Sequence, residues 1–232
     1  MLHRWWICGG VVESRQHLIK APDLKIFFGS ISPETPLYMH SDGIRNRKIK
    51  GRNSLNLKYA PSLCAVCNNA RTQKHDEAWA DVASFLQSEA SPLKIGTKLD
   101  LQTALGAEYR VRLVHLQLFF VKQFGCLVVE SNAPIDLKLF RNSILKNTAH
   151  PHIFLKFIKG FRRGEKTLLS RSALTITSIN GRMICADFFY ILDDIAVFVV
   201  LAMPGMPLAN SMIYAIQPNI PKRRIRISHY AE

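Results

Sequence analysis

The stretch Cys64-Ala-Val-Cys67-Asn-Asn-Ala-Arg-Thr-Gln-Lys-His-Asp76 sets the fold of the first third of this 232-residue chain. Cysteines three residues apart place two thiolates about one helical turn apart, where they can hold one tetrahedral zinc ion. A redox pair and two buried thiols at a helix start are the alternatives. No thioredoxin-like strand and helix with a Trp-Cys-Gly setting surrounds the motif, which disfavours the redox pair. The spacing therefore predicts a metal site at the start of a helix.

Helical spacing continues beyond the second cysteine. Four polar residues fall at offsets 0, 3, 4 and 7 and share one helix face: Asn68, Arg71, Thr72 and His75. A solvent-facing polar surface is the alternative interpretation of this face. Apolar residues then recur every three or four positions from Ala78 to Leu86, which predicts an amphipathic helix that ends near Pro92.

The middle of the chain also favours helices. Residues 109–129 are rich in apolar side chains and predict a buried helix that breaks near Gly125 and ends at residues 132–134. Residues 137–146 predict a further short helix.

After residue 150 the hydrophobic period changes from about 3.6 to 2. Asn180-Gly181 separates two β-rich runs and favours a type I′ turn, because both central residues of that turn need positive φ. Asp193-Asp194 predicts a second turn, so residues 173–203 predict a three-stranded antiparallel meander. Residues 221–227 predict a basic edge strand or tail. Together these patterns predict an α+β fold.

The chain carries 31 Lys+Arg against 17 Asp+Glu, a formal net charge of +14. Residues 1–76 hold half of this excess, and their largest cluster spans residues 45–58. Such a surface favours an anionic partner such as nucleic acid or an acidic membrane surface. The composition is that of a globular protein and excludes disordered, collagen-like and coiled-coil classes. The sequence contains no nucleotide-binding glycine motif and no nucleophile elbow, so it offers nothing for ATP use, redox cofactors or serine hydrolysis.

The five cysteines are an odd number and no secretory segment accompanies them, which favours thiols or metal ligation over disulfides. Residues 111–129 and 184–203 are apolar, but charged and polar residues interrupt both runs. We therefore expect a soluble cytoplasmic protein without a membrane partner.

Three features at fixed places resemble the HNH-endonuclease family: a Cys8-Gly9 knuckle, a histidine at position 17 that opens a short apolar run, and the distant Leu-Cys-x-x-Cys-Asn. The likeness is narrowest to the compact branch with the signature Cys-Asn-Asn-x-Arg-Thr-Gln-x-x-Asp, and it covers about residues 3–80. It implies a small zinc-stapled ββα-metal module over residues 1–90, followed by a second α+β domain over residues 91–232. The zinc ligands would be Cys8, Cys64 and Cys67, with His3, a water or nothing in the fourth position.

The same resemblance implies metal-dependent hydrolysis of DNA phosphodiester bonds. His17 would be the general base and Asn68 would ligate a catalytic Mg²⁺ or Mn²⁺. Asn53 or Asn56 would orient the base. The residues expected to contact phosphates are Arg45, Arg47, Lys48, Lys50, Arg52, Lys58 and Arg71.

Three positions depart from the family pattern. Trp5 stands where the knuckle has its first cysteine, Gln16 replaces the acid before the base, and Tyr59 stands near the place of the middle asparagine. Each change removes charge or a ligand. Besides an active nuclease, we therefore consider a catalytically degenerate module that only binds nucleic acid, and an interaction protein that self-associates through its C-terminal domain.

Overall fold

The computed structural model describes residues 6–11, 13–41, 44–89, 94–160, 167–204, 215–219 and 224–229. The fold is α+β, as the sequence predicts. The helices are α1 (Ala21–Phe28), α2 (Ala65–Asn68), α3 (Gln73–Glu89), α4 (Leu101–Leu105), α5 (Tyr109–Ser131) and α6 (Lys138–Lys146). The strands are β1 (Leu37–Ser41), β2 (Ile44–Ile49), β3 (Lys98–Asp100), β4 (Ile153–Lys159), β5 (Leu169–Arg171), β6 (Thr175–Ile179), β7 (Arg182–Leu192), β8 (Ile195–Ala202), β9 (Arg224–Arg226) and β10 (Ser228–His229).

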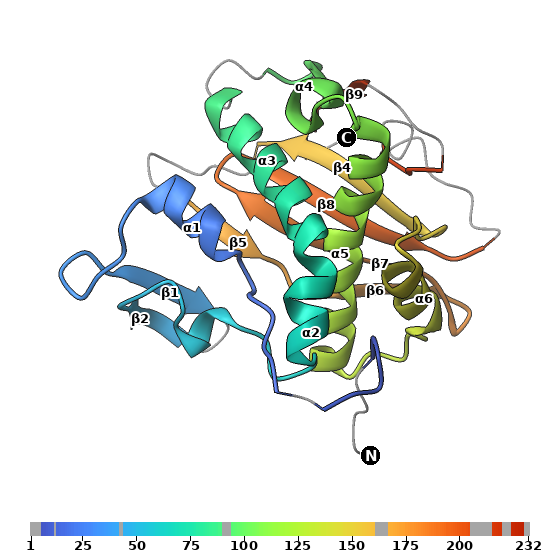
Figure 1. Ribbon diagram of the computed structural model, residues 1–232, viewed down its shortest axis with the longest axis horizontal. Helices are drawn as coiled ribbons and strands as arrows, with labels where there is room; N and C mark the ends of the chain where they lie inside the picture. Colours follow the sequence, from blue (N-terminus) through green and yellow to red (C-terminus); the bar gives the residue numbers. More distant parts are fainter. Residues whose placement is uncertain are drawn as a thin grey trace.

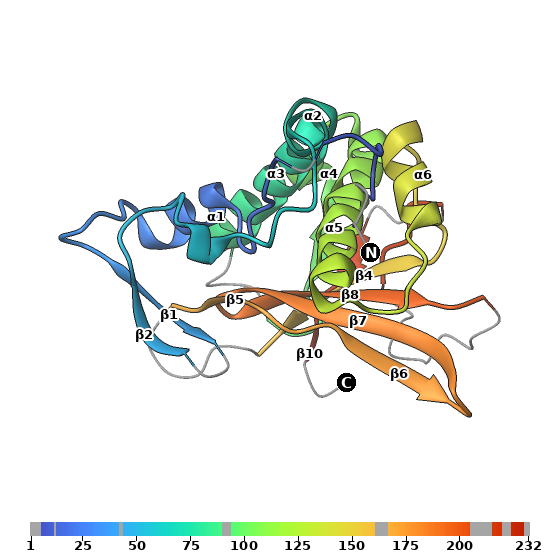
Figure 2. The same cartoon turned by 90° about the horizontal axis from the view of Figure 1, so that it is seen from below.

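One sheet organises the molecule. Its strand order is β10-β4-β8-β7-β5, and β6 also pairs with β7. All of these pairs are antiparallel except β10 with β4. Helices α3, α5 and α6 lie together on one face of the sheet (Figure 2). Two smaller antiparallel ribbons, β1–β2 and β3–β9, complete the sheets.

The antiparallel meander predicted from the sequence is confirmed as β6, β7 and β8. Its first turn is Asn180-Gly181, and both residues have positive φ, 51° and 75°. Asn and Gly tolerate this backbone conformation better than other residues do. The second turn contains Asp193 with a φ of 58°. Turn chemistry thus specifies the two turns locally, burial alternates over residues 186–192 of β7, and β8 is a continuous apolar run.

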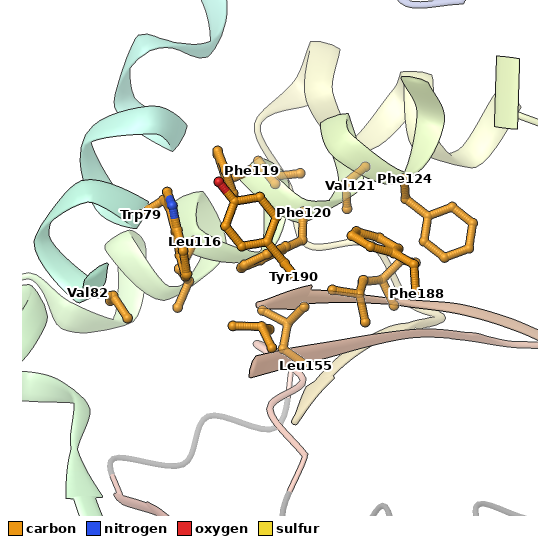
Figure 3. Packing of buried hydrophobic residues seen from close by; sticks show 14 of the residues in the cluster. Trp79, Val82, Leu116, Phe119, Phe120, Val121, Phe124, Leu155, Phe188 and Tyr190 are labelled. Carbon is orange, nitrogen blue, oxygen red and sulfur yellow. The ribbon is translucent and has the colours of Figure 1, made fainter. Parts of the chain in front are cut away.

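Helix α5 is the core element of the fold, beside α3 and over the sheet (Figure 1). Trp79 of α3 stacks on Phe119 of α5 at a ring distance of 5.3 Å and meets Tyr190 of β7 edge-on at 5.2 Å (Figure 3). By length and composition α5 would suit a membrane span, but 83% of its most apolar window is buried inside the protein. That burial is typical of a core helix.

The predicted break of the long helix at Gly125 is wrong, because α5 runs on to Ser131. The glycine has a packing role instead. A Cβ added at this position would lie 2.5 Å from two atoms of the Trp6 ring, so only glycine lets the indole rest on the helix. The helix ends where the sequence predicts, at Asn132 in the left-handed conformation.

Side chains from both ends of the chain share one hydrophobic cluster. It includes Trp6 and Tyr59 from the N-terminal third together with residues of α5 and of the sheet. The division into domains at residue 90 stays a prediction.

Candidate functional site

Three cysteines meet at the N-terminal end of the helical layer. Atoms Sγ of Cys8, Cys64 and Cys67 all lie within 4.8 Å of one another, with Cys8 and Cys64 3.4 Å apart. Cys64 is the N-cap of α2, and its sulfur accepts the Cys67 amide at 3.3 Å. The Gly10 amide donates to the Cys8 sulfur at 3.4 Å. Amide donors aimed at clustered sulfurs are typical of a structural metal knuckle.

Two of the three thiols have shifted pKa values. Burial and the two neighbouring thiols raise the pKa of Cys67 to about 12. Burial also acts to raise the pKa of Cys8, but the Gly10 amide, the other thiols and Arg71 outweigh it and lower that pKa. Arg71 itself donates to the Cys67 sulfur at 3.6 Å. The raised pKa keeps the Cys67 thiol protonated in the metal-free protein, and a metal ion bound by all three sulfurs would displace that proton. Three soft sulfur donors suit zinc. His3, proposed as the fourth ligand, lies outside the described residues.

Two segments of the chain before α2 run antiparallel to each other. Two antiparallel bridges, Ser14 with Leu63 and His17 with Lys58, join residues 13–18 to residues 57–63. Backbone hydrogen bonds continue between them, including Tyr59 N–H to Gln16 O at 2.9 Å. Helix α2 follows directly.

The side chain of Asn68, at the end of α2, contacts the segment that carries His17. Atom Nδ2 of Asn68 donates to Ser14 Oγ at 2.8 Å and to Arg15 O at 3.1 Å, two residues before His17. Atoms Asn68 Oδ1 and His17 Nδ1 are buried and have no hydrogen-bond partner among the described residues. Buried polar atoms are normally satisfied, so each of these two atoms could contact a ligand.

The electrostatic setting keeps the His17 imidazole neutral. Burial, then Lys58 and Lys20, lower its pKa to about 4, against a smaller opposing effect of Asp76. A neutral imidazole can accept a proton or coordinate a metal ion. Gln16, where the family has an acid, is buried with its Nε2 unpartnered among the described residues.

Thr72 and Asp76, two residues of the signature, bind a buried lysine of α5. In the sequence this lysine only interrupts the apolar run of residues 111–129. Lys122 of α5 is fully buried, and its Nζ lies 2.8 Å from Thr72 Oγ1 and 3.0 and 3.2 Å from the Asp76 carboxylate. Lys20 pairs with the same carboxylate at 2.8 Å. Thr72 also donates its hydroxyl hydrogen toward the carbonyls of Cys67 and Asn68. These contacts connect the helical segment after the thiol cluster to the core helix α5.

The predicted phosphate-contacting residues form an exposed surface on strand β2 and the turn after it. Five of them are exposed on this strand and turn: Arg45, Arg47, Lys48, Lys50 and Arg52. Lys58 is half-buried beside His17, and Arg71 is exposed beside the thiol cluster. We call the five exposed residues the basic hairpin surface. No ion pair in the described part of the chain uses any of them.

The two asparagines considered for orienting the base lie near this surface. Asn56 accepts a hydrogen bond from Arg47 Nη1 at 2.9 Å, and Asn53 is exposed in the turn. Within the described ranges, no hydrogen bond joins either side chain to His17. Their assignment stays a prediction.

Comparison with known proteins finds no relative. No protein family, curated protein or solved structure matches this chain. The resemblance to the HNH family therefore depends on the residues of the chain itself, of which the three clustered cysteines are the part that the structure brings together.

Proposed function

We propose that the protein binds nucleic acid, DNA above all, through a zinc-stapled ββα module that resembles the scaffold of the HNH endonucleases. One observation carries the proposal: the basic hairpin surface presents five exposed cations with no acidic partner in the described part of the chain. The sequence contains no Asp or Glu between residues 43 and 75. Unpaired cations on one strand can replace the counterions of a phosphate backbone.

The thiol cluster supports the same proposal by fixing the module. Zinc held by Cys8, Cys64 and Cys67 would join the knuckle to the start of α2. The segment with the basic hairpin lies between these cysteines in the chain, so the metal would hold both of its ends. The role assigned to zinc here is structural.

The test measures binding of a fluorescent DNA duplex by anisotropy at several salt concentrations. A triple variant neutralises Arg45, Lys48 and Lys50 with Gln and leaves Arg47 to its bond with Asn56. Each lost phosphate contact lowers the slope of log K against log salt by about 0.9, so the slope should fall by up to about 2.7.

A matched control removes the same charge from another surface. Helix α6 carries three exposed cations, Lys138, Arg141 and Lys146, and their Gln variants should bind the duplex as the wild type does apart from a small long-range effect. Equal weakening by both triple variants would show that net charge alone attracts DNA, and the proposal would fail.

Phosphodiester cleavage is the second candidate function. The unpartnered atoms His17 Nδ1 and Asn68 Oδ1 favour it, since the family uses these two positions for the base and a metal ligand. The donor set nevertheless fits Mg²⁺ or Mn²⁺ poorly. Both donors are neutral, hard cations prefer carboxylates, and the Asp76 carboxylate is already bound by two lysines. We therefore derive no cleavage step through a metal.

Plasmid nicking tests this second function. Cleavage with Mg²⁺ or Mn²⁺ that is lost in His17→Ala and Asn68→Ala, with zinc content and melting temperature retained, would support it. Intact plasmid in both metals would leave binding as the function.

A further inference from the structure

The hairpin β1–β2 also carries an aromatic side chain that no packing contact explains. Tyr38 of β1 is 60% exposed, and it is the one aromatic residue among the large exposed apolar side chains of the described ranges. The other described aromatic residues are buried or half-buried. Single exposed tyrosines are common on protein surfaces, so the groups that surround Tyr38 decide whether it could contact a ligand.

Tyr38 shares one face of the hairpin with part of the basic hairpin surface, while Arg47, paired with Met39, lies on the other face. In the antiparallel register it is paired directly with Lys48 of β2, so the two side chains leave the ribbon on the same face. His40, two residues along β1, is exposed as well. A π-face beside unpaired cations is the combination with which proteins bind single-stranded nucleic acid, because bases stack on the ring while the cations follow the phosphates.

A cavity opens next to the ring. Its volume is about 600 Å³, and its lining includes Tyr38, Phe28 of α1, Leu168 and the polar groups of His40, Asn46 and Ser170. A second cavity of about 530 Å³ shares His40 and Ser170 and extends toward Glu130 and Arg171. The hairpin lies beside α1 and β5 in both views of the ribbon (Figures 1 and 2). Volumes in this range accept small-molecule-sized groups, and apolar walls with a few polar atoms suit a nucleobase.

We propose that the hairpin binds single-stranded nucleic acid, with an unpaired base stacked on Tyr38 at the mouth of this cavity and the adjoining phosphates on Lys48 and Lys50. The inference rests on the proposed nucleic-acid binding and names its substrate class. Bases inside a duplex are already stacked and paired, so they offer no free face to the ring. Unpaired bases do.

The experiment compares a labelled single-stranded thymidine oligonucleotide with a labelled duplex of equal length, using the full chain in an anisotropy titration. Tyr38→Ala should weaken single-strand binding by at least about 5-fold, the lower limit for loss of one stacked base. Duplex binding should change by less than twofold. Tyr38→Phe keeps the ring and should bind the single strand like the wild type, which also shows that the hairpin is intact.

The outcomes separate the two proposals. If the wild type binds neither oligonucleotide, the proposed function fails and this inference with it. If it binds both but Tyr38→Ala weakens both equally, or neither, then nucleic-acid binding stands and the stacking site is refuted. Tyr38→Phe binding as weakly as Tyr38→Ala would refute it too.

Discussion

Replacing Asp76 with Asn tests how the signature sequence is anchored to the core. Asp76 is the only described carboxylate that pairs with Lys122, whose ammonium is fully buried and has Thr72 as its other hydrogen-bond partner. Lys20 shares the same carboxylate. The substitution Asp76→Asn would therefore leave two ammonium groups facing a neutral amide, one of them without access to water.

Loss of one partner from a buried ion pair costs about 3–5 kcal/mol. Since the Asp76 side chain keeps 23% of its exposure, water can reach its outer edge and the loss should lie near the lower limit, about 3 kcal/mol. Replacing Lys122 with Met as well removes the stranded charge. The double variant should then be more stable than the sum of the two single losses by about 0.5–3 kcal/mol.

The assay is urea denaturation at pH 7 followed by tryptophan fluorescence. Asp81→Asn is the matched control on the same helix, because Asp81 pairs with Arg112 at the surface and its loss should cost less than about 1 kcal/mol. Asp76 does not compensate the buried charge of Lys122 if Asp76→Asn lowers the free energy of unfolding no more than Asp81→Asn does. The same conclusion follows if the losses caused by Asp76→Asn and by Lys122→Met simply add in the double variant.

Three further outcomes are expected. Gly125→Ala should lower the free energy of unfolding by about 1–3 kcal/mol, because its methyl group would overlap the Trp6 ring; an unchanged or higher melting temperature would contradict this. Three histidines share a pKa lowered to about 4, chiefly by burial: His17, His75 and His150. Unfolding releases them to a pKa near 6.5, so their stabilisation is complete above that pH and is lost as the pH falls toward 4. Asp23 acts in the opposite direction, because burial raises its pKa to about 6 and it offsets the uptake of up to one proton. The free energy of unfolding should therefore fall by about 2–3 kcal/mol per pH unit near pH 5 in denaturation series, and a flat profile would argue against this. Elemental analysis should find about one zinc per chain in the wild type and much less in Cys64→Ser. A metal-free wild type would refute zinc binding by the three cysteines.

Elements with strong local signals were predictable. The meander follows from the turn at Asn180-Gly181 and from the apolar-rich strands that it joins to the second turn, and helix α3 ends close to the predicted limit. The cluster of Cys64 with Cys67 follows from their spacing, and the family resemblance adds Cys8 from 56 residues away. In each case neighbouring residues or a known motif carry the information.

Features set by distant contacts were not predictable. Gly125 by itself suggests a helix break. The glycine is explained only by its contact with the Trp6 ring, which comes from a distant part of the chain. Half of the residues of strand β2 are charged and the strand shows little apolar alternation, so nothing local marks it as half of a hairpin. Lys122 looks like an interruption because its partners, Thr72 and Asp76, come from another helical segment. Propensity yields to tertiary contacts at all three places.

A metal ion bound to the thiol cluster would also restrict the unfolded chain. Cys8 and Cys64 are 56 positions apart, and a cross-link over that span lowers the conformational entropy of an unfolded polypeptide by an amount worth about 4 kcal/mol at 25 °C. A metal ion that stays bound to both sulfurs imposes the same restriction. An unfolded chain that keeps its metal would thus hold the whole cationic hairpin within a closed loop, and a chelator would release it.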